Sequence, residues 1–317
     1  MTAVVFQIVQ LVLVVAAAPL LTGVVRLVKA RLNGRRGPSP LQPYRDLARL
    51  LRKDVLVTDT ASWLFQAAPY AVFVLTWLAA SLVPTLATGF ALAPAADLIL
   101  LAGLLGTARA VQALAALDTG TAFGGIGASR EMMIAALAEP AMLMVVLSLA
   151  ILVGTTAAPA VVEALAQGSV GVRVSLAMAL VTLVMVALAE TGRVPIDNPA
   201  THLELTMVHE AMVLEYGGRH LALIELAGML RLLLFVSLIG AVFVPWTLLP
   251  RDGAPAMALL GLVAYGAKLL VAAVLLGLFE TSIAKMRVFR VAEFLGVAFL
   301  VGVMAAIFLF VSRGIGP

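Results

Sequence analysis

The chain has 317 residues, of which 63% are hydrophobic and only 12% are charged, whereas a soluble domain has roughly a quarter charged residues. Charge is too scarce to cover a water-facing globule of this size, so the composition excludes a soluble protein. The net charge of +4 does not indicate a nucleic-acid partner, because Lys and Arg concentrate in the loops of one predicted membrane side. The chain has no cysteine, which excludes disulfides, cysteine-ligated iron–sulfur clusters and thiol nucleophiles.

Eight apolar runs predict eight transmembrane helices, since about 20 apolar residues span a hydrocarbon core of roughly 30 Å. We place them at 4–25, 64–88, 94–117, 132–156, 173–192, 221–249, 257–281 and 293–312. The predicted fold class is an all-α integral membrane protein, with residues 1–317 forming a single polytopic domain. The first run lacks the basic start of a signal peptide, so we expect it in the mature protein.

The distribution of Lys and Arg predicts the orientation of the chain. The loops at 26–54, 118–131, 193–220 and 282–292 hold fifteen basic residues, and the opposite loops hold three. We therefore expect a multi-pass protein of a bacterial or archaeal cytoplasmic membrane, with both termini on the non-cytoplasmic side. Its longest loops, 26–63 and 193–220, then lie on the cytoplasmic side, where we expect the working face.

The first of these loops predicts an interfacial helix. Pro43 fits the first position of a helix, and apolar residues then recur at helical spacing opposite charged ones. Such a helix lies on anionic lipid or docks a partner subunit, and the sequence leaves both open. The candidate structural or interface residues of this loop are Arg36, Pro38, Tyr44, Arg45 and Asp46.

Several carboxylates fall within or beside the spans. Glu139 precedes Pro140 inside the fourth span, where a carboxylate costs about 2.5–3.5 kcal/mol on insertion scales and needs water or a partner. Because several protonatable groups within helical reach are typical of a proton route, we predict a relay. Its candidates are Glu131, Glu139, Glu190, Asp197, Glu204, Glu210, Glu215 and Glu225. The alternative is that intramembrane charges, Arg109 and Lys268 among them, pair across helices and only fix the packing.

The segment 193–220 is the most informative. Pro199 near its start and Gly217 with Gly218 near its end predict a helix over about 199–216. On that helix Glu204 and Glu215 return to within about 20° of one face, which we expect to line a cavity rather than a solvated surface.

The glycine-rich segment 118–131 has no P-loop Lys-Ser/Thr, so we do not expect a nucleotide site. We interpret Gly120, Gly124, Gly125 and Gly127 as permitting a tight turn at the membrane surface. The histidines match no metal-site motif, and no metal or cofactor is expected in this chain.

The motif Glu190-Thr191-Gly192-Arg193-Val194-Pro195-Ile196-Asp197, followed by Glu204-Leu205 and Glu215-Tyr216-Gly217-Gly218, resembles the membrane subunit shared by respiratory complex I and membrane-bound nickel–iron hydrogenases. The run from Arg36-Gly37-Pro38 to Asp46-Leu47 is similar to the hydrogenase branch, the formate hydrogenlyase subunit 4 type. The resemblance covers essentially the whole chain.

The resemblance implies a scaffold that holds a hydrophilic electron-transfer arm on the membrane and joins it to antiporter-like pumping subunits. The implied partners are a hydrogenase-like large subunit with a [NiFe] centre and a small iron–sulfur subunit. It also implies that acidic residues at Glu190, Asp197, Glu204 and Glu215 relay charge from the redox reaction into the membrane. Arg193 belongs to the same motif and is a candidate structural residue.

Two alternatives stay open. The first is a quinone-reducing complex I subunit, which needs a lipid-accessible chamber under the first-loop helix and the 193–220 segment. The second is a stand-alone secondary transporter, which is disfavoured because the chain shows no internal repeat of the kind common in such proteins.

Overall fold

The computed structural model of the chain describes residues 2–58, 61–167, 174–197, 207–245, 258–284, 286 and 288–315. This described part is helical and contains no strand. Its helices are α1 (Thr2–Leu32), α2 (Gln42–Leu51), α3 (Trp63–Leu82), α4 (Leu98–Asp118), α5 (Ala122–Val153), α6 (Ala158–Ala166), α7 (Val174–Glu190), α8 (His209–Val213), α9 (Gly218–Phe243), α10 (Ala258–Ser282) and α11 (Val288–Ile315). One 3₁₀ turn, η1 (Ala93–Ala95), precedes α4.

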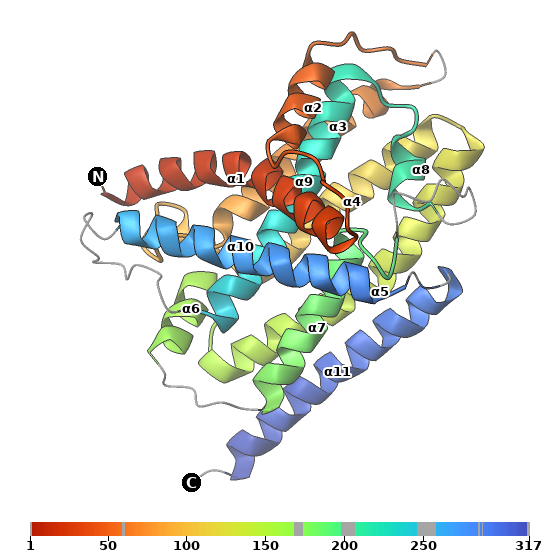
Figure 1. Cartoon of the computed structure of the whole chain (residues 1–317). Helices are drawn as coiled ribbons and strands as arrows, with labels where there is room; N and C mark the ends of the chain where they lie inside the picture. Colours follow the sequence, from red (N-terminus) through yellow and green to blue (C-terminus); the bar gives the residue numbers. More distant parts are fainter. Residues whose placement is uncertain are drawn as a thin grey trace.

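Seven of the described helices are long and apolar enough to cross a membrane: α1, α3, α4, α5, α9, α10 and α11. The predicted fifth span corresponds to α7, an apolar helix that is shorter, with 17 residues. The prediction of an all-α multi-pass membrane protein is confirmed. In Figure 1, α1 begins and α11 ends on the left of the view, whereas α2 lies near the top and α8 at the upper right, both away from those two chain ends.

The predicted loop at 118–131 is wrong over most of its length, because α5 already begins at Ala122, ten residues before the predicted span. Thr121 accepts a hydrogen bond from the Gly124 amide and caps the helix. A Cβ on Gly124 would lie 2.3 Å from the Ala116 carbonyl oxygen, so this glycine lets α5 turn tightly away from α4. Of the four glycines, only Gly120 has a positive φ and makes the turn itself.

The predicted helix over 199–216 is also wrong in the described part, where only His209–Val213 is helical, and residues 198–206 lie outside the described residues. Two side chains bind backbone groups just before α8. A carboxylate oxygen of Asp197 accepts from the Val208 amide at 3.2 Å, and Arg130 donates to the Met207 carbonyl at 3.0 Å. These bonds hold the backbone there in a non-helical course, since side-chain partners compete with helical ones.

The first-loop helix is confirmed as α2, with proline in its first turn and one face buried through Pro43 and Leu47. The Tyr44 hydroxyl donates to the Ala16 carbonyl of α1, and burial raises the pKa of this tyrosine. The interfacial helix therefore packs on the bundle as well as facing outward.

The Tyr216-Gly217-Gly218 motif, at the start of α9, contacts the first turn of α3 and the end of the first loop. The Tyr216 ring stacks on Phe65 at 4.0 Å between ring centres, and its hydroxyl donates to the Phe65 carbonyl at 3.0 Å. Burial raises the pKa of Tyr216. Gly218 has a φ of +55°, and a Cβ there would lie 2.4 Å from the Asp54 carbonyl oxygen. Only glycine fits this position without strain.

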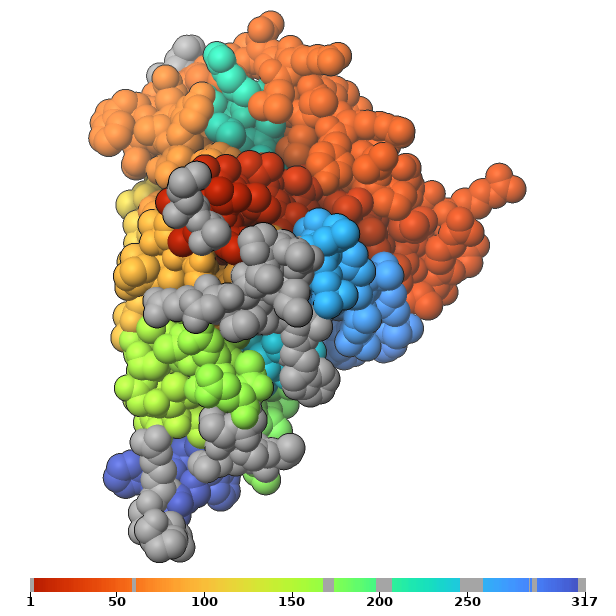
Figure 2. All heavy atoms as spheres, turned by 90° about the vertical axis from the view of Figure 1, so that its left-hand side faces the viewer, coloured from red at the N-terminus to blue at the C-terminus, as the bar shows by residue number. Residues whose placement is uncertain are grey.

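Helix α10 packs mainly on α1. A Cβ on Gly277 would lie 2.7 Å from Val28 Cγ1, which shows how closely the two helices approach. Figure 2 shows α10 in light blue at the molecular surface beside the red and dark orange α1. Most of the other side chains of α10, such as Val271 and Leu275, are exposed, as expected for a helix that faces lipid.

Candidate functional site

The centre of the bundle holds a buried arginine among carboxylates. Arg109 of α4 is only 1% exposed. Its Nε lies 3.2 Å from Glu131 Oε1 and its Nη1 lies 3.9 Å from Glu139 Oε1, while its Nη2 contacts Glu190 Oε2. These four residues form what we call the Arg109 cluster. A buried charge needs such partners, because an unpaired one loses its hydration without compensation.

Three helices position the cluster. Glu131 and Glu139 lie eight residues apart on α5, about 12 Å along the helix axis, and Glu190 is the last residue of α7. Gly106 of α4 leaves space for one of these carboxylates, since a Cβ there would lie 3.1 Å from Glu139 Oε1. The sequence therefore places one cation and three carboxylates where α4, α5 and α7 meet.

Two further charged residues extend the cluster. Arg231 of α9 is buried and donates through Nη1 to the Glu190 carbonyl at 3.3 Å. Asp197 is also buried, and the charges of Arg231 and Asp197 both act on Glu131. Two buried arginines thus share the described interior with three buried carboxylates, Glu131, Glu190 and Asp197, and Glu139 lies at its edge. Because Glu131 and Glu190 share the single guanidinium of Arg109, with Arg231 beside them, a proton gained or lost by either carboxylate changes the charge balance of the interior.

Glu139 connects the cluster to the outside of the bundle. Its side chain is 47% exposed, whereas that of Glu190 is 6% exposed. Both line a cavity of about 520 Å³ between α4 and α5. Exposed apolar residues, among them Ile99 and Leu143, also line this cavity, so it opens on the lateral face of the bundle.

A second, polar pocket of about 210 Å³ lies beside the cluster toward α8. Its lining includes Arg26, Arg193, Asp197, His209, Glu210 and Glu225, and we call it the Asp197 pocket. Burial lowers the pKa of His209 to about 4, and the positive charge of Arg231 acts in the same direction. His209 is therefore neutral at pH 7.

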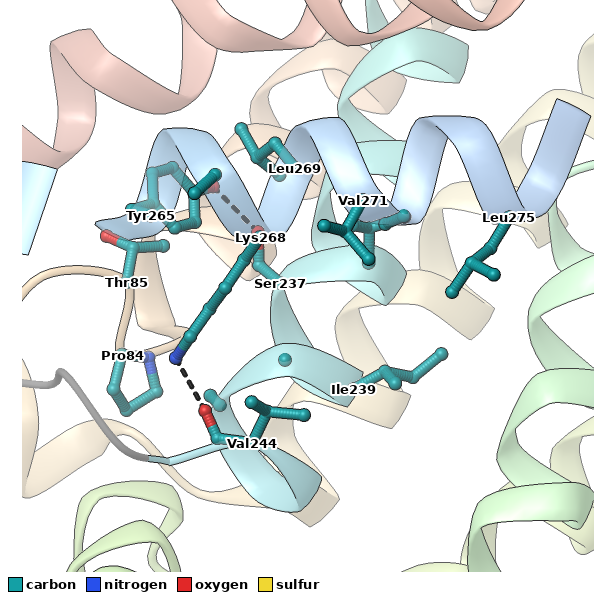
Figure 3. Close-up of a pocket in the computed structure, with 15 residues that line it drawn as sticks. Pro84, Thr85, Ser237, Ile239, Val244, Tyr265, Lys268, Leu269, Val271 and Leu275 are labelled. Carbon is teal, nitrogen blue, oxygen red and sulfur yellow. Dashed lines mark hydrogen bonds between the residues drawn. The ribbon is translucent and has the colours of Figure 1, made fainter. Parts of the chain in front are cut away.

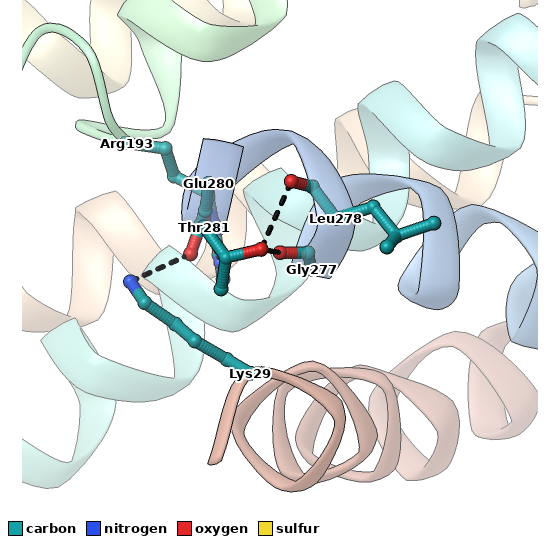
Figure 4. Close-up of polar contacts among 6 residues, drawn as sticks. All are labelled: Lys29, Arg193, Gly277, Leu278, Glu280 and Thr281. Carbon is teal, nitrogen blue, oxygen red and sulfur yellow. Dashed lines mark hydrogen bonds and ion pairs between the residues drawn. The ribbon is translucent and has the colours of Figure 1, made fainter. Parts of the chain in front are cut away.

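A third group of charges joins the ends of three elements. Glu280 of α10 pairs with Lys29 of α1 at 2.9 Å and with Arg193, three residues after α7, at 2.7 Å. Figure 4 shows Lys29 reaching from α1 to this carboxylate. We call these three residues the Glu280 clamp. Here two cations enclose one carboxylate, the reverse of the Arg109 cluster.

The structure brings most of the predicted relay residues together. Glu131, Glu139 and Glu190 meet at Arg109, and Asp197, Glu210 and Glu225 line the adjacent pocket. Glu215 lies in the turn after α8 and lines neither cavity, and Glu204 lies outside the described residues. That these groups relay protons stays a prediction.

The predicted structural and interface residues differ in their burial and in their contacts. Arg109 is the hub of the cluster and Arg193 belongs to the clamp, whereas Arg36, Pro38 and Arg45 are exposed. Asp46 pairs with Arg49 at 3.2 Å on α2. Lys268 is not fully buried, and its ammonium donates to the Val244 carbonyl at 2.5 Å.

The sequence alone could not single out two residues of these charged groups. Arg231 is one of several intramembrane charges, and Lys29 is one of many basic residues in the first loop. Lys29 and Glu280 are 251 positions apart, so no local spacing marks their pairing. Among the described residues, no group of three His, Asp or Glu side chains is placed to hold a metal ion.

Comparison with known proteins shows the family of the chain. Residues 4–311 match the protein family described as NADH dehydrogenase. The chain is 32% identical to formate hydrogenlyase subunit 4 of Escherichia coli (strain K12), over 90% of this chain and 91% of that protein. It is 30% identical to hydrogenase-4 component C of the same organism, over 96% of this chain and 95% of that protein.

A solved structure shares the fold. The similar chain belongs to the membrane-bound sulfane sulfur reductase, an archaeal respiratory membrane complex. It has a TM-score of 0.80 and 19% identity, and the match covers 96% of this chain and 98% of that one. All three relatives are parts of larger assemblies by their descriptions.

Proposed function

Since the chain belongs to the NADH dehydrogenase family, we propose that it anchors a group 4 [NiFe] hydrogenase or formate hydrogenlyase-type complex in the membrane and couples its redox reaction to ion transport. The relatives support a membrane subunit of such a complex, because both E. coli proteins match over at least nine tenths of their length. These two relatives disfavour a stand-alone transporter, since each is described as a subunit or component.

The redox centres of the proposed complex belong to other subunits. The chain has no cysteine, and iron–sulfur clusters are held mainly by cysteine thiolates. The partners we propose are a hydrogenase-like large subunit with the [NiFe] centre, a small iron–sulfur subunit and antiporter-like membrane subunits. The electron-transfer arm would dock on the end of the bundle that carries α2 and α8, which by the charge bias faces the cytoplasm.

The Arg109 cluster is the observation that carries the coupling role. Its carboxylates come from two helices and share one buried guanidinium, so a change in the protonation of one alters the balance of the others. A charge change at the Asp197 pocket would shift protons within the cluster, and Glu139 would pass them to a neighbouring subunit at the lateral cavity.

A pKa shift in such a cluster can supply the free energy that moving one proton requires. Moving one proton against 100 mV takes about 2.3 kcal/mol. A shift of one to two pKa units in a buried carboxylate corresponds to about 1.4–2.7 kcal/mol. The same carboxylates could bind sodium ions in place of protons.

Replacement of Glu139 tests the coupling role. In inverted membrane vesicles that hold the whole complex, Glu139→Gln should abolish ion translocation while dihydrogen evolution from a soluble electron donor continues. Glu139 suits the test because it is half exposed and makes the longest of the three ion pairs of Arg109. Glu163→Gln on α6, outside the cluster, is the matched control. Equal loss of both activities in a normally assembled complex would contradict the proposal.

The quinone-reducing alternative requires a chamber near α2 and the 193–220 segment. The described residues form there the Asp197 pocket of about 210 Å³ with charged lining, whereas ligand sites usually enclose about 300–1,000 Å³ and are mostly apolar. This pocket does not favour a quinone. Quinone-dependent turnover of the purified complex that an inhibitor blocks would reverse that preference.

A further inference from the structure

An apolar groove runs between α9 and α10, outside the charged clusters. Two cavities, of about 350 and 260 Å³, lie along it. They share four lining residues, Val236, Ile239, Ala272 and Leu275. The two cavities are therefore parts of one groove, which reaches Lys268 at one end and Phe279 at the other. These two residues are eleven positions apart on α10, which corresponds to about 16 Å, or three helical turns.

The polar end of the groove lies near the middle of the membrane. Lys268 comes ten residues after Ala258, the first residue of α10, which corresponds to about 15 Å along the helix. A hydrocarbon core is roughly 30 Å thick, so Lys268 leaves the helix at about half of that depth. From there the groove leads toward Phe279, close to the end of α10 at Ser282.

The Lys268 ammonium lacks an anionic partner among the described residues. Figure 3 shows its side chain extending from α10 to the Val244 carbonyl at the end of α9. An ammonium has three donors, so two remain after this bond. The nearby hydroxyls of Ser237 and Tyr265 bond to each other at 2.7 Å. No described carboxylate pairs with Lys268, although a cation at this depth is costly and rare without a partner.

The walls of the groove are exposed and apolar. Of the seven described helices that could cross a membrane, α10 has the smallest buried share, 17%. Leu275 is 61% exposed and lines both cavities. Gly240 of α9 and Ala272 of α10 also line the groove, and such small residues let another helix approach closely. A phospholipid does not fit, because its phosphate would lie at mid-depth while its acyl chains pointed toward the surface.

From this geometry we propose that the groove seats a transmembrane helix of another subunit, which carries one aspartate or glutamate at the depth of Lys268. The carboxylate accepts from the two remaining donors of the ammonium, and the apolar side chains of the helix cover Leu275 and its neighbours. Charged residues within membranes pair in this way across helices. The inference requires a complex of several subunits, but it does not depend on proton transfer by the Arg109 cluster.

Photocrosslinking in the intact membrane complex tests the occupant. The photoreactive residue p-benzoylphenylalanine is placed at Leu275 or, as the matched control, at Leu270, which is 56% exposed on the same helix and lines neither cavity. Only position 275 should crosslink to a transmembrane segment of another subunit, and mass spectrometry should find an Asp or Glu within that segment. A segment without a carboxylate, a second copy of this chain, or a crosslink to lipid alone would overturn the proposal.

Variants of the charge test the ion pair. Lys268→Met should lower the amount of the crosslinked subunit that stays with the complex during purification in detergent, and Lys268→Arg should retain it. Lys268→Glu combined with a lysine at the partner carboxylate should restore the subunit. Unchanged retention in Lys268→Met would contradict the pairing.

A further control separates a partner carboxylate from one of this chain. Asp252 is the one acidic residue of the connection 244–257, and it lies outside the described residues. Asp252→Asn should leave both the crosslink and the retained subunit at wild-type levels. A loss equal to that of Lys268→Met would place the ion pair within this chain and overturn the proposal. Ion transport enters none of these measurements, so their outcome is independent of the coupling test at Glu139.

Discussion

The Arg109 cluster and the Glu280 clamp use the same residue types with opposite charge balance. In the cluster one arginine is shared by three carboxylates, whereas in the clamp one carboxylate is shared by two cations. The clamp is balanced without any bound proton, since Lys29 and Arg193 are partly exposed and retain water. The Arg109 cluster has more carboxylates than guanidinium groups, so its net charge depends on how many of the carboxylates carry a proton. Charge balance, more than burial, therefore distinguishes the cluster, for which we propose a proton relay, from the clamp, which joins helix ends.

Removing the hub of the cluster should have the largest effect. Arg109→Met leaves Glu131 and Glu190 buried without their cation, which costs about 3–5 kcal/mol for a broken buried pair. We expect a marked fall in the thermal midpoint of the detergent-solubilised protein and poor assembly. Arg109→Lys keeps the positive charge, so its thermal midpoint should fall less than that of Arg109→Met. A Met variant as stable as wild type would show that the carboxylates are already protonated.

Gly218 provides a reference in which no charge takes part. Gly218→Ala combines a left-handed backbone with a Cβ 2.4 Å from the Asp54 carbonyl, and strain of this kind costs about 1–3 kcal/mol. Gly217→Ala is the matched control, since its φ is −131° and a Cβ there meets nothing within 4 Å. Thermal unfolding of the two variants should differ clearly. Similar midpoints would mean that the first loop does not depend on this contact.

Removing the negative charge of Glu280 should lower stability less than the loss of Arg109 does, and it should leave the coupling of ion transport unchanged. Glu280→Gln leaves two cations that can turn to water, so we expect a loss of about 1–2 kcal/mol, below the roughly 3–5 kcal/mol for a broken buried ion pair. The ratio of ions moved to dihydrogen formed should stay at its wild-type value. A changed ratio in vesicles would place Glu280 in the transport route and remove the contrast with the cluster.

The last contrast appears only as a pH dependence, at His209. Its pKa is lowered to about 4 in the folded protein, first by burial and then by Arg231, while Asp197 acts in the opposite direction. The unfolded chain binds the proton near pH 6.5. Stability from this residue is therefore complete above pH 6.5 and is lost as pH falls toward 4. His209→Gln should narrow the difference between melting at pH 7 and at pH 5, and an unchanged difference would contradict this.

Local patterns predicted much of the fold and part of the site. The apolar runs located the long helices, and Pro43 with its amphipathic spacing located α2. The predictions failed where distant side chains bind the backbone. Asp197 and Arg130 hold residues 207–208 out of a helix, and Gly124 lies within α5 because of its contact with Ala116. Such contacts have no local signature.

By itself the sequence determined that this is a multi-pass membrane protein with carboxylates at membrane depth, because apolar length and charge counts are properties of the chain alone. Only the tertiary structure decided which charges meet. Arg109 gathers carboxylates from α5 and α7, whereas Glu280 gathers cations from α1 and the segment after α7. The reason is physical: a buried charge takes its partner from whichever helix packs against it, and helix packing depends on the shape of all the faces at once.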